Sequence, residues 1–131
     1  MNLRSSFPML VLVGLAVVLG SVPPALAKKH PSEVTKLRKQ CDRGNKEACV
    51  KLGGMYRFGI GVKQDSKKAM NLFRKACAGE YAVGCSMLGV MYENGAGLSR
   101  DNQKVLEYYG KACNFKSEMG CNNYARLNKQ N

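Results

Sequence analysis

Apolar residues recur at helical spacing in four segments of the chain, and no segment shows the alternation of apolar and polar residues that marks a strand. In the first and third segments the spacing i, i+3, i+4, i+7 places these residues on one face of a helix. They are Ala48, Cys49, Leu52, Met55 and Tyr56, then Ala82, Cys85, Leu88, Gly89 and Tyr92. The second and fourth segments carry the stripes Ala69, Phe73, Ala76, Cys77 and Val105, Tyr109, Ala112, Cys113. The pattern predicts an all-α fold.

Turn and capping residues separate these helices. Gly59-Ile60-Gly61 and Gly95-Ala96-Gly97 follow the first and third helices, and glycine ends a helix readily because it adopts positive φ at little cost. Asp65 and Asp101 come next and are N-cap candidates for the helices that follow. Shorter stripes at the two ends predict one more helix each, which gives about six helices. These stripes are Val34, Leu37, Cys41 and Cys121, Tyr124, Ala125.

The six cysteines reveal an internal repeat. Cys41, Cys77 and Cys113 are 36 residues apart, and so are Cys49, Cys85 and Cys121. Residues 41–76 and 77–112 align without a gap, flanked by half-units at 32–40 and 113–128. A period of this length is the signature of a repeat array in which each unit buries its apolar face against the next.

The motif within each unit resembles a known family. The order of residues in each unit is similar to that of the Sel-1-like repeat, and the match covers about residues 32–128. This order is Leu-Gly-x-Met-Tyr, followed by Gly-x-Gly, then Asp, then Lys-Ala-Cys. The resemblance implies an α/α solenoid of antiparallel helix pairs related to tetratricopeptide arrays. Cysteines eight residues apart are most similar to the secreted, cysteine-rich bacterial branch, which implies one disulfide within each helix pair. The last unit departs from the pattern and suits a terminal cap.

The cysteine spacing also constrains the backbone. Eight residues of continuous helix rise about 12 Å, whereas a disulfide needs Cα atoms within roughly 7 Å. A chain reversal is therefore expected at Gly44-Asn45, at Gly79-Glu80 and at Lys116-Ser117. The expected disulfides are Cys41–Cys49, Cys77–Cys85 and Cys113–Cys121. Zinc or redox-active sites are the alternatives, but the chain has no Cys-x-x-Cys and a single histidine, His30, so no metal or cofactor is expected.

Residues 1–27 have the order of a secretory signal peptide. An early positive charge at Arg4 precedes an apolar stretch, which ends in two prolines and Ala25-Leu26-Ala27. A retained membrane anchor is the alternative, since residues 7–27 carry no charge and could just span a bilayer. The order favours cleavage, which leaves residues 28–131 as the repeat domain, without a membrane span, in the periplasm or outside the cell.

The chain is strongly basic, with a net charge of +12, and it keeps a large positive charge after removal of residues 1–27. A basic surface can bind nucleic acid, but export argues against that partner. An acidic protein or peptide, or an anionic envelope polymer, is the expected partner. The terminal helices favour a monomer, because polar residues at their outer positions would cap the array.

The sequence contains few of the residues that an enzymatic function would need. Some cysteine-rich members of the resembled family are described as weak β-lactamases or penicillin-binding proteins, and this remains the alternative function. The chain has neither Ser-x-x-Lys nor Lys-Thr-Gly, and His30 lies too near the expected mature terminus for a catalytic triad. No catalytic residue is therefore assigned.

Binding is the favoured function, because solenoids dock partners on the concave surface formed by the first helices of successive units. The predicted contact positions are those opposite the apolar stripe: Val50, Gly54, Arg57, Ser86, Val90, Asn122 and Arg126. Val83 belongs to the same set. Burial of these helices on both faces is the alternative explanation for the valines. The sequence thus predicts an exported adaptor, or an effector or inhibitor of another protein.

Overall fold

The structure is a computed structural model that describes residues 24–96 and 100–130, with side chains from Ser32 onward. Within these ranges it contains helices and no strand, which confirms the all-α prediction. The helices are α2 (Pro24–Asp42), α3 (Lys46–Phe58), α4 (Ser66–Ala78), α5 (Ala82–Glu93), α6 (Asn102–Asn114) and α7 (Glu118–Asn128). Most of the expected signal peptide, residues 1–23, lies outside the described residues. The chain divides into two units, Met1–His30 and Pro31–Asn131, and all contacts below lie within the second.

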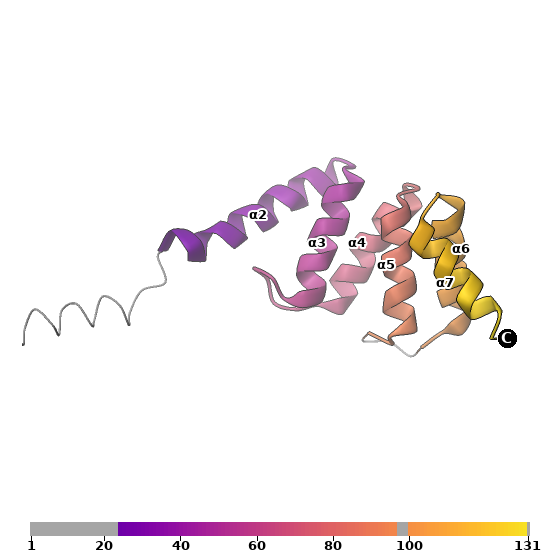
Figure 1. Ribbon diagram of the computed structural model, residues 1–131. Helices are drawn as coiled ribbons and strands as arrows, with labels where there is room; N and C mark the ends of the chain where they lie inside the picture. Colours follow the sequence, from indigo (N-terminus) through magenta and orange to yellow (C-terminus); the bar gives the residue numbers. More distant parts are fainter. Residues whose placement is uncertain (1–23, 97–99, 131) are drawn as a thin grey trace, which may run out of the picture. The chain divides into compact units, whose positions relative to one another are not determined.

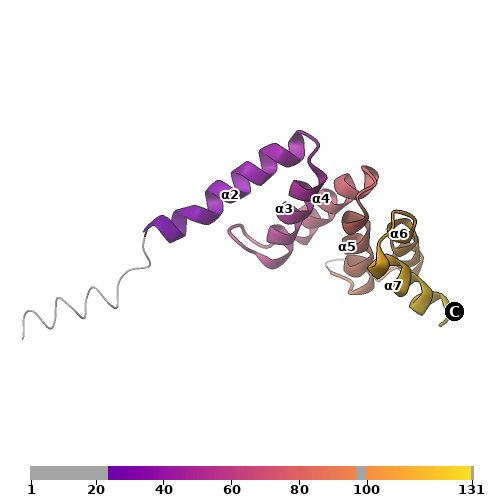
Figure 2. The same cartoon turned by 45° about the horizontal axis from the view of Figure 1, so that its top comes forward.

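The helices of Pro31–Asn131 form two layers. In Figures 1 and 2, α3, α5 and α7 follow one another in one layer, and α4 and α6 lie in the other. Each helix packs against the next along the chain, from α3 to α7. The largest buried side chains include Leu52, Phe73, Leu88 and Tyr109, which are at most 1% exposed. The predicted α/α solenoid of antiparallel helix pairs is therefore confirmed.

Glycine allows the two helices of each pair to approach closely. A Cβ atom on Gly53 of α3 would lie 2.6 Å from the ring of Phe73 on α4. One repeat later, a Cβ on Gly89 of α5 would lie 2.7 Å from the ring of Tyr109 on α6. A buried aromatic ring thus packs directly on helix backbone in both units, which explains why a glycine follows Leu52 in the first unit and Leu88 in the second.

The predicted caps are present. The carboxylates of Asp65 and Asp101 accept hydrogen bonds from the backbone N–H groups of Lys68 and Lys104, at 3.0 and 3.1 Å. Helix α3 ends at Gly59, which has a φ of 68° and lies in the left-handed region. The side-chain chemistry read from the sequence therefore sets where α4 and α6 begin and where α3 ends.

The three disulfides are those that the spacing and the resemblance predicted. Cys41–Cys49 joins α2 to α3, Cys77–Cys85 joins α4 to α5, and Cys113–Cys121 joins the end of α6 to α7. The Cα atoms of each pair lie 4.7, 4.6 and 4.4 Å apart. No free cysteine remains. The chain reverses within each eight-residue interval, and the covalent link closes the reversal.

Each of these reversals contains one residue with positive φ at an equivalent position. Gly44 has a φ of 93°, Glu80 of 63° and Lys116 of 69°. This region costs an L-residue about 1–2 kcal/mol, whereas glycine enters it freely. Two of the three turns therefore store backbone strain that the first turn avoids.

Replacing Lys116 by glycine is expected to raise the free energy of unfolding by about 0.5–1 kcal/mol, because relief of the positive φ outweighs the greater freedom of glycine in the unfolded chain. Urea denaturation of the oxidised protein measures the change. The matched control is Gly44→Ala, whose new Cβ would meet nothing within 4 Å, so that only backbone conformation is tested. Gly44→Ala should lower the free energy of unfolding. If both variants raised it, or both lowered it, the positive φ would not be the cause of the change.

The last helix differs from the expectation. Tyr124 and Ala125 were expected in the buried stripe of α7, but both are exposed, and the buried residues are Gly120 and Leu127. In α3 and α5 the matching positions are covered by the helix that follows, and the described chain has no helix after α7. Tyr124 instead lies along α6, with its ring 3.3 Å from where a Cβ of Gly110 would be.

Candidate functional site

The first helices of the units expose a common surface, which we call the α3–α5–α7 face. It is defined by nine residues, three on each of α3, α5 and α7. These are Val50, Gly54 and Arg57 on α3, Val83, Met87 and Val90 on α5, and Met119, Asn122 and Arg126 on α7. The three helices lie side by side, since α5 contacts both α3 and α7.

The structure places most of the predicted contact residues at this surface. Val50, Gly54, Arg57 and Val90 are half-buried, while Asn122 and Arg126 are exposed. A Cβ on Gly54 would meet nothing within 4 Å, so the surface is open above this residue.

Ser86 is the exception, and its prediction as a contact residue is wrong. The side chain is 0% exposed, and its Oγ lies 3.0 Å from the Oγ of Ser117 in the turn between α6 and α7. Helix α5 is surrounded by α4, α6, α3 and α7. At the position of Ser86, helix α5 is therefore buried on both faces, which was the alternative to a partner-binding surface.

An apolar strip runs across α5 and α7 on this face. Val83 and Met119 are 42% and 40% exposed, and Met87 and Val90 are half-buried beside them. Met119 follows Val83 by one repeat, so the 36-residue register could have identified it from the sequence, where it was missed. Exposed apolar side chains on two helices that contact each other are typical of an interaction surface.

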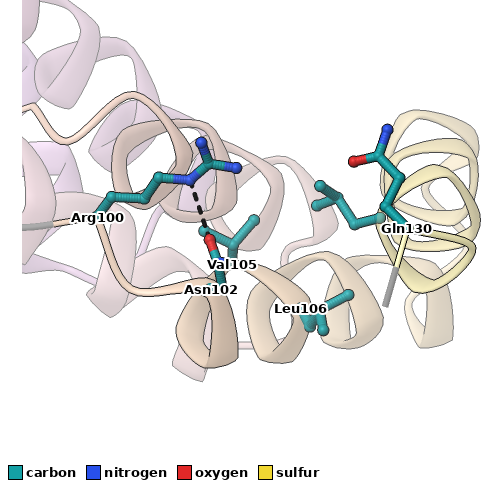
Figure 3. Close-up of a pocket in the computed structure, with 6 residues that line it drawn as sticks. Arg100, Asn102, Val105, Leu106 and Gln130 are labelled. Atoms are coloured by element: carbon teal, nitrogen blue, oxygen red, sulfur yellow. Dashed lines mark hydrogen bonds between the residues drawn. The ribbon is translucent and has the colours of Figure 1, made fainter.

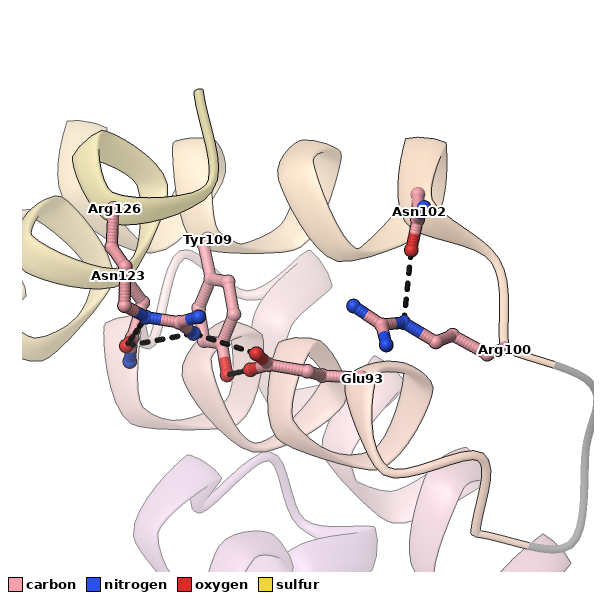
Figure 4. A network of polar contacts seen from close by, with 6 residues as sticks. All are labelled: Glu93, Arg100, Asn102, Tyr109, Asn123 and Arg126. Carbon is pink, nitrogen blue, oxygen red and sulfur yellow. Dashed lines mark hydrogen bonds and ion pairs between the residues drawn. The ribbon is translucent and has the colours of Figure 1, made fainter. Parts of the chain in front are cut away.

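A polar network borders the strip and ties α7 to α5 and α6 (Figure 4). The Nη2 atom of Arg126 donates to Oε1 of Glu93 at 2.6 Å, and the hydroxyl of Tyr109 donates to Oε2 at 2.8 Å. The guanidinium of Arg126 also lies 3.4 Å from Oδ1 of Asn123. Arg126 was predicted to contact a partner, and with 44% of its side chain exposed it remains accessible while holding α7 in place.

The network shifts the pKa of both acidic groups. Burial opposes ionisation of Glu93, but the hydrogen bonds from Arg126 and Tyr109 outweigh it and hold the pKa of Glu93 below its ordinary value. Burial, followed by the hydrogen bond to the Glu93 carboxylate, raises the pKa of the Tyr109 hydroxyl. Glu93 is therefore ionised and Tyr109 neutral at physiological pH.

The stabilisation from Glu93 is expected to depend on pH. Because its folded pKa is depressed, the contribution is complete above the unfolded value near 4.5 and disappears as pH falls through the lower folded value. Glu93→Gln should therefore destabilise the protein at neutral pH, and the difference from wild type should shrink as the pH falls below about 4.5. Urea denaturation across this range measures it. Arg126→Gln should reduce the same pH dependence of stability. If wild type and Glu93→Gln differed by the same free energy of unfolding at all pH values, the depressed pKa of Glu93 would be contradicted.

Tyrosine and basic side chains link successive helices through the other layer. The Nη2 atom of Arg38 donates to the hydroxyl of Tyr56 at 2.8 Å, and Nζ of Lys68 lies 5.3 Å from the centre of the same ring. The arrangement recurs one repeat later in Arg74, Tyr92 and Lys104, at 2.9 and 5.4 Å. The hydrogen bond to Tyr92 raises the pKa of Arg74. Some of the basic side chains that make the chain positive therefore link neighbouring helices.

The described part of the repeat domain has one small cavity and several wider clefts of about 340–420 Å³. The one shown in Figure 3, between the start of α6 and the end of α7, has a volume of about 50 Å³. It is lined by Arg100, Asn102, Val105, Leu106, Leu127 and Gln130. Small-molecule sites usually measure 300–1,000 Å³, so this cavity is too small for an organic ligand. Within the described ranges no group of three His, Cys, Asp or Glu side chains could hold a metal ion.

Comparison with family models identifies two Sel1 repeats, at residues 46–81 and 82–114. The chain belongs to the Sel1 repeat family. Each matched segment begins at the first residue of a helix, Lys46 of α3 and Ala82 of α5. The match covers more than half of the chain and agrees with the resemblance seen in the sequence. Sel1 repeat proteins are generally protein-interaction scaffolds.

Solved structures with this fold include other Sel1 repeat proteins. Cysteine-rich protein B of Helicobacter pylori is 31% identical, with a TM-score of 0.65, over 68% of this chain and 67% of that protein. A Sel1 repeat protein from Oxalobacter formigenes is 25% identical, with a TM-score of 0.65, over 70% and 69% of the two chains. A protective antigen of uropathogenic Escherichia coli is 27% identical, with a TM-score of 0.73, over 90% of this chain and 24% of its own. No curated protein sequence matches the chain significantly.

Proposed function

We propose that this Sel1 repeat protein is an exported adaptor that binds a segment of a partner protein on the α3–α5–α7 face. The apolar strip carries the proposal. Val83 and Met119 are more than a third exposed on neighbouring helices, and a partner would remove both from water together. Arg126 belongs to the same surface, with 44% of its side chain exposed.

Export is part of the proposal and rests on two observations. Residues 1–27 have the order of a secretory signal peptide. All six cysteines are paired, and disulfides of this kind persist in oxidising compartments. None of the helices in the described part of the chain is long and apolar enough to cross a membrane.

An acidic partner is the finer proposal. The chain has a net charge of +12, and Arg57 and Arg126 lie on the outer helices of the face, on either side of α5. Binding should therefore weaken as salt concentration rises, because screening reduces the attraction between the partner's carboxylates and these side chains.

Photo-crosslinking in the producing cells tests the binding face. A benzophenone amino acid is placed at Val83 or Met119 and, as the matched control, at Asn71, which is exposed on α4 in the other layer. We expect covalent adducts of one defined protein at Val83 and Met119 and none at Asn71. Adducts at all three positions, or at Asn71 alone, would exclude the α3–α5–α7 face as the binding surface.

Affinity measurement with the captured protein completes the test. Val83→Asp and Val90→Asp should weaken binding at least tenfold, because each places a charge in the strip. Asn71→Asp is the control with the same added charge on the other layer. Equal losses for all three variants would indicate a general electrostatic effect and contradict the proposed face.

A further inference from the structure

The end of α3 and the loop that follows it expose two large apolar side chains. Phe58, the last residue of α3, is 65% exposed, and Ile60 in the loop is 47% exposed. Neither residue belongs to the α3–α5–α7 face. In the second unit Asn94 and Ala96 occupy the equivalent positions. Since the second unit forms the same helix pair with asparagine and alanine there, the fold does not require large apolar residues at these positions.

The backbone of this loop is held by hydrogen bonds. Gly59 and Gly61 both have a φ of 68°. The N–H of Ile60 donates to the carbonyl of Met55 at 2.9 Å, the N–H of Asp65 donates to that of Tyr56 at 2.8 Å, and Nε2 of Gln64 donates to that of Arg57 at 2.8 Å. The loop is therefore an ordered turn that holds Phe58 and Ile60 toward solvent.

Positive charge lies beside these apolar side chains. A cleft of about 360 Å³ between the loop and the start of α4 is lined by Lys63 and Lys68. Its remaining lining residues are Tyr56, Val62, Gln64 and Asp65. The carboxylate of Asp65 is engaged in capping α4, through the N–H of Lys68 at 3.0 Å. The guanidinium of Arg57 lies 5.0 Å from the centre of the Phe58 ring.

We propose that this loop binds an anionic lipid surface. Phe58 and Ile60 enter the interfacial region of the bilayer, and Lys63 and Lys68 hold the phosphate of a lipid headgroup in the adjacent cleft. Exposed apolar side chains flanked by basic residues are the combination that binds anionic membranes. The apolar residues protrude from a turn, and a bilayer accepts a protrusion without a complementary pocket, which favours lipid over an acidic protein as the occupant.

Vesicle binding of the exported, oxidised protein tests the proposal. The probe is vesicles of equal parts phosphatidylglycerol and phosphatidylcholine, compared with phosphatidylcholine alone, in a sedimentation assay. We expect binding to the anionic vesicles only. The double variant Phe58→Asn with Ile60→Ala introduces the residue types found at the equivalent positions of the second unit. It should weaken binding to the anionic vesicles at least tenfold. Lys63→Glu should weaken it at least fivefold, because each basic residue near an anionic surface contributes about that factor.

A control variant separates this site from the proposed adaptor face. Val83→Ser with Met119→Ser removes two exposed apolar side chains elsewhere and should leave vesicle binding unchanged, while Phe58→Asn with Ile60→Ala should leave partner crosslinking unchanged. Absence of binding to the anionic vesicles would overturn the lipid proposal, as would equal binding by the Phe58 and Ile60 variant. Loop-dependent binding to a polyglutamate peptide, without vesicle binding, would assign the loop to an acidic protein instead and also overturn it.

Discussion

Replacing Cys77 and Cys85 together by alanine is expected to lower the free energy of unfolding by about 3 kcal/mol. This disulfide joins α4 to α5 and therefore links the helix pair α3–α4 to the helix pair α5–α6. Closing a loop of about nine residues stabilises a protein by about 2–3 kcal/mol in the chain-entropy model. Cys85 is fully buried, so the lost packing of its sulfur adds to the effect. Chemical denaturation of wild type and variant measures the difference.

The matched control is the double alanine variant of Cys113 and Cys121. It opens a loop of the same length, but both of its cysteines are only partly buried. The decrease in the free energy of unfolding should therefore be smaller than for Cys77 and Cys85. The difference between the two variants measures the contribution of the buried sulfur packing. An unchanged free energy of unfolding after removal of Cys77–Cys85 would show that the disulfide does not contribute to stability.

Neighbouring glycines on α3 are expected to respond to alanine in opposite directions. A methyl group on Gly53 would lie 2.6 Å from a ring carbon of Phe73, which is 1% exposed and has little room to move. Gly53→Ala should therefore destabilise the protein by about 1–3 kcal/mol. A methyl group on Gly54 meets nothing within 4 Å. Gly54→Ala should stabilise the protein by about 0.5–1 kcal/mol, because alanine loses less backbone freedom in a helix.

The two variants control for one another, since both replace glycine by alanine in the same helix. Thermal and urea unfolding measure the two free energies under identical conditions. If both variants were stabilised, Phe73 would not pack on the α3 backbone as described. Restoration of stability in Gly53→Ala by the smaller Phe73→Leu would support the contact directly.

The fold could be predicted in detail because most of its determinants are local or periodic. The 36-residue cysteine register, the caps at Asp65 and Asp101 and the turns between paired cysteines are all readable from the sequence, and the structure contains each of them. The positive φ at Glu80 and Lys116 was not predictable, because neither residue favours that conformation and only the short connection imposes it.

The candidate site was less predictable, because exposure depends on neighbouring helices. Ser86 occupies the same helix position as Val50 and Asn122, but the turn before α7 covers it. Tyr124 matches the buried Leu88 in register, yet it is exposed because no described helix follows α7. The pairing of Glu93 with Arg126 and Tyr109 joins three helices, and no sequence spacing indicates it. Helix periodicity predicts a face, whereas tertiary packing decides which of its residues a partner can reach.

Peptide mapping of the non-reduced protein tests the stacked, disulfide-closed architecture most directly. Trypsin with glutamyl endopeptidase cleaves inside every cysteine interval, after Arg43 and Lys46, after Glu80 and after Lys116. Mass spectrometry should then find three linked peptide pairs: Cys41 with Cys49, Cys77 with Cys85, and Cys113 with Cys121. A free thiol, or a bridge between cysteines of different intervals, would contradict the chain reversals on which the helix pairs and the α3–α5–α7 face depend.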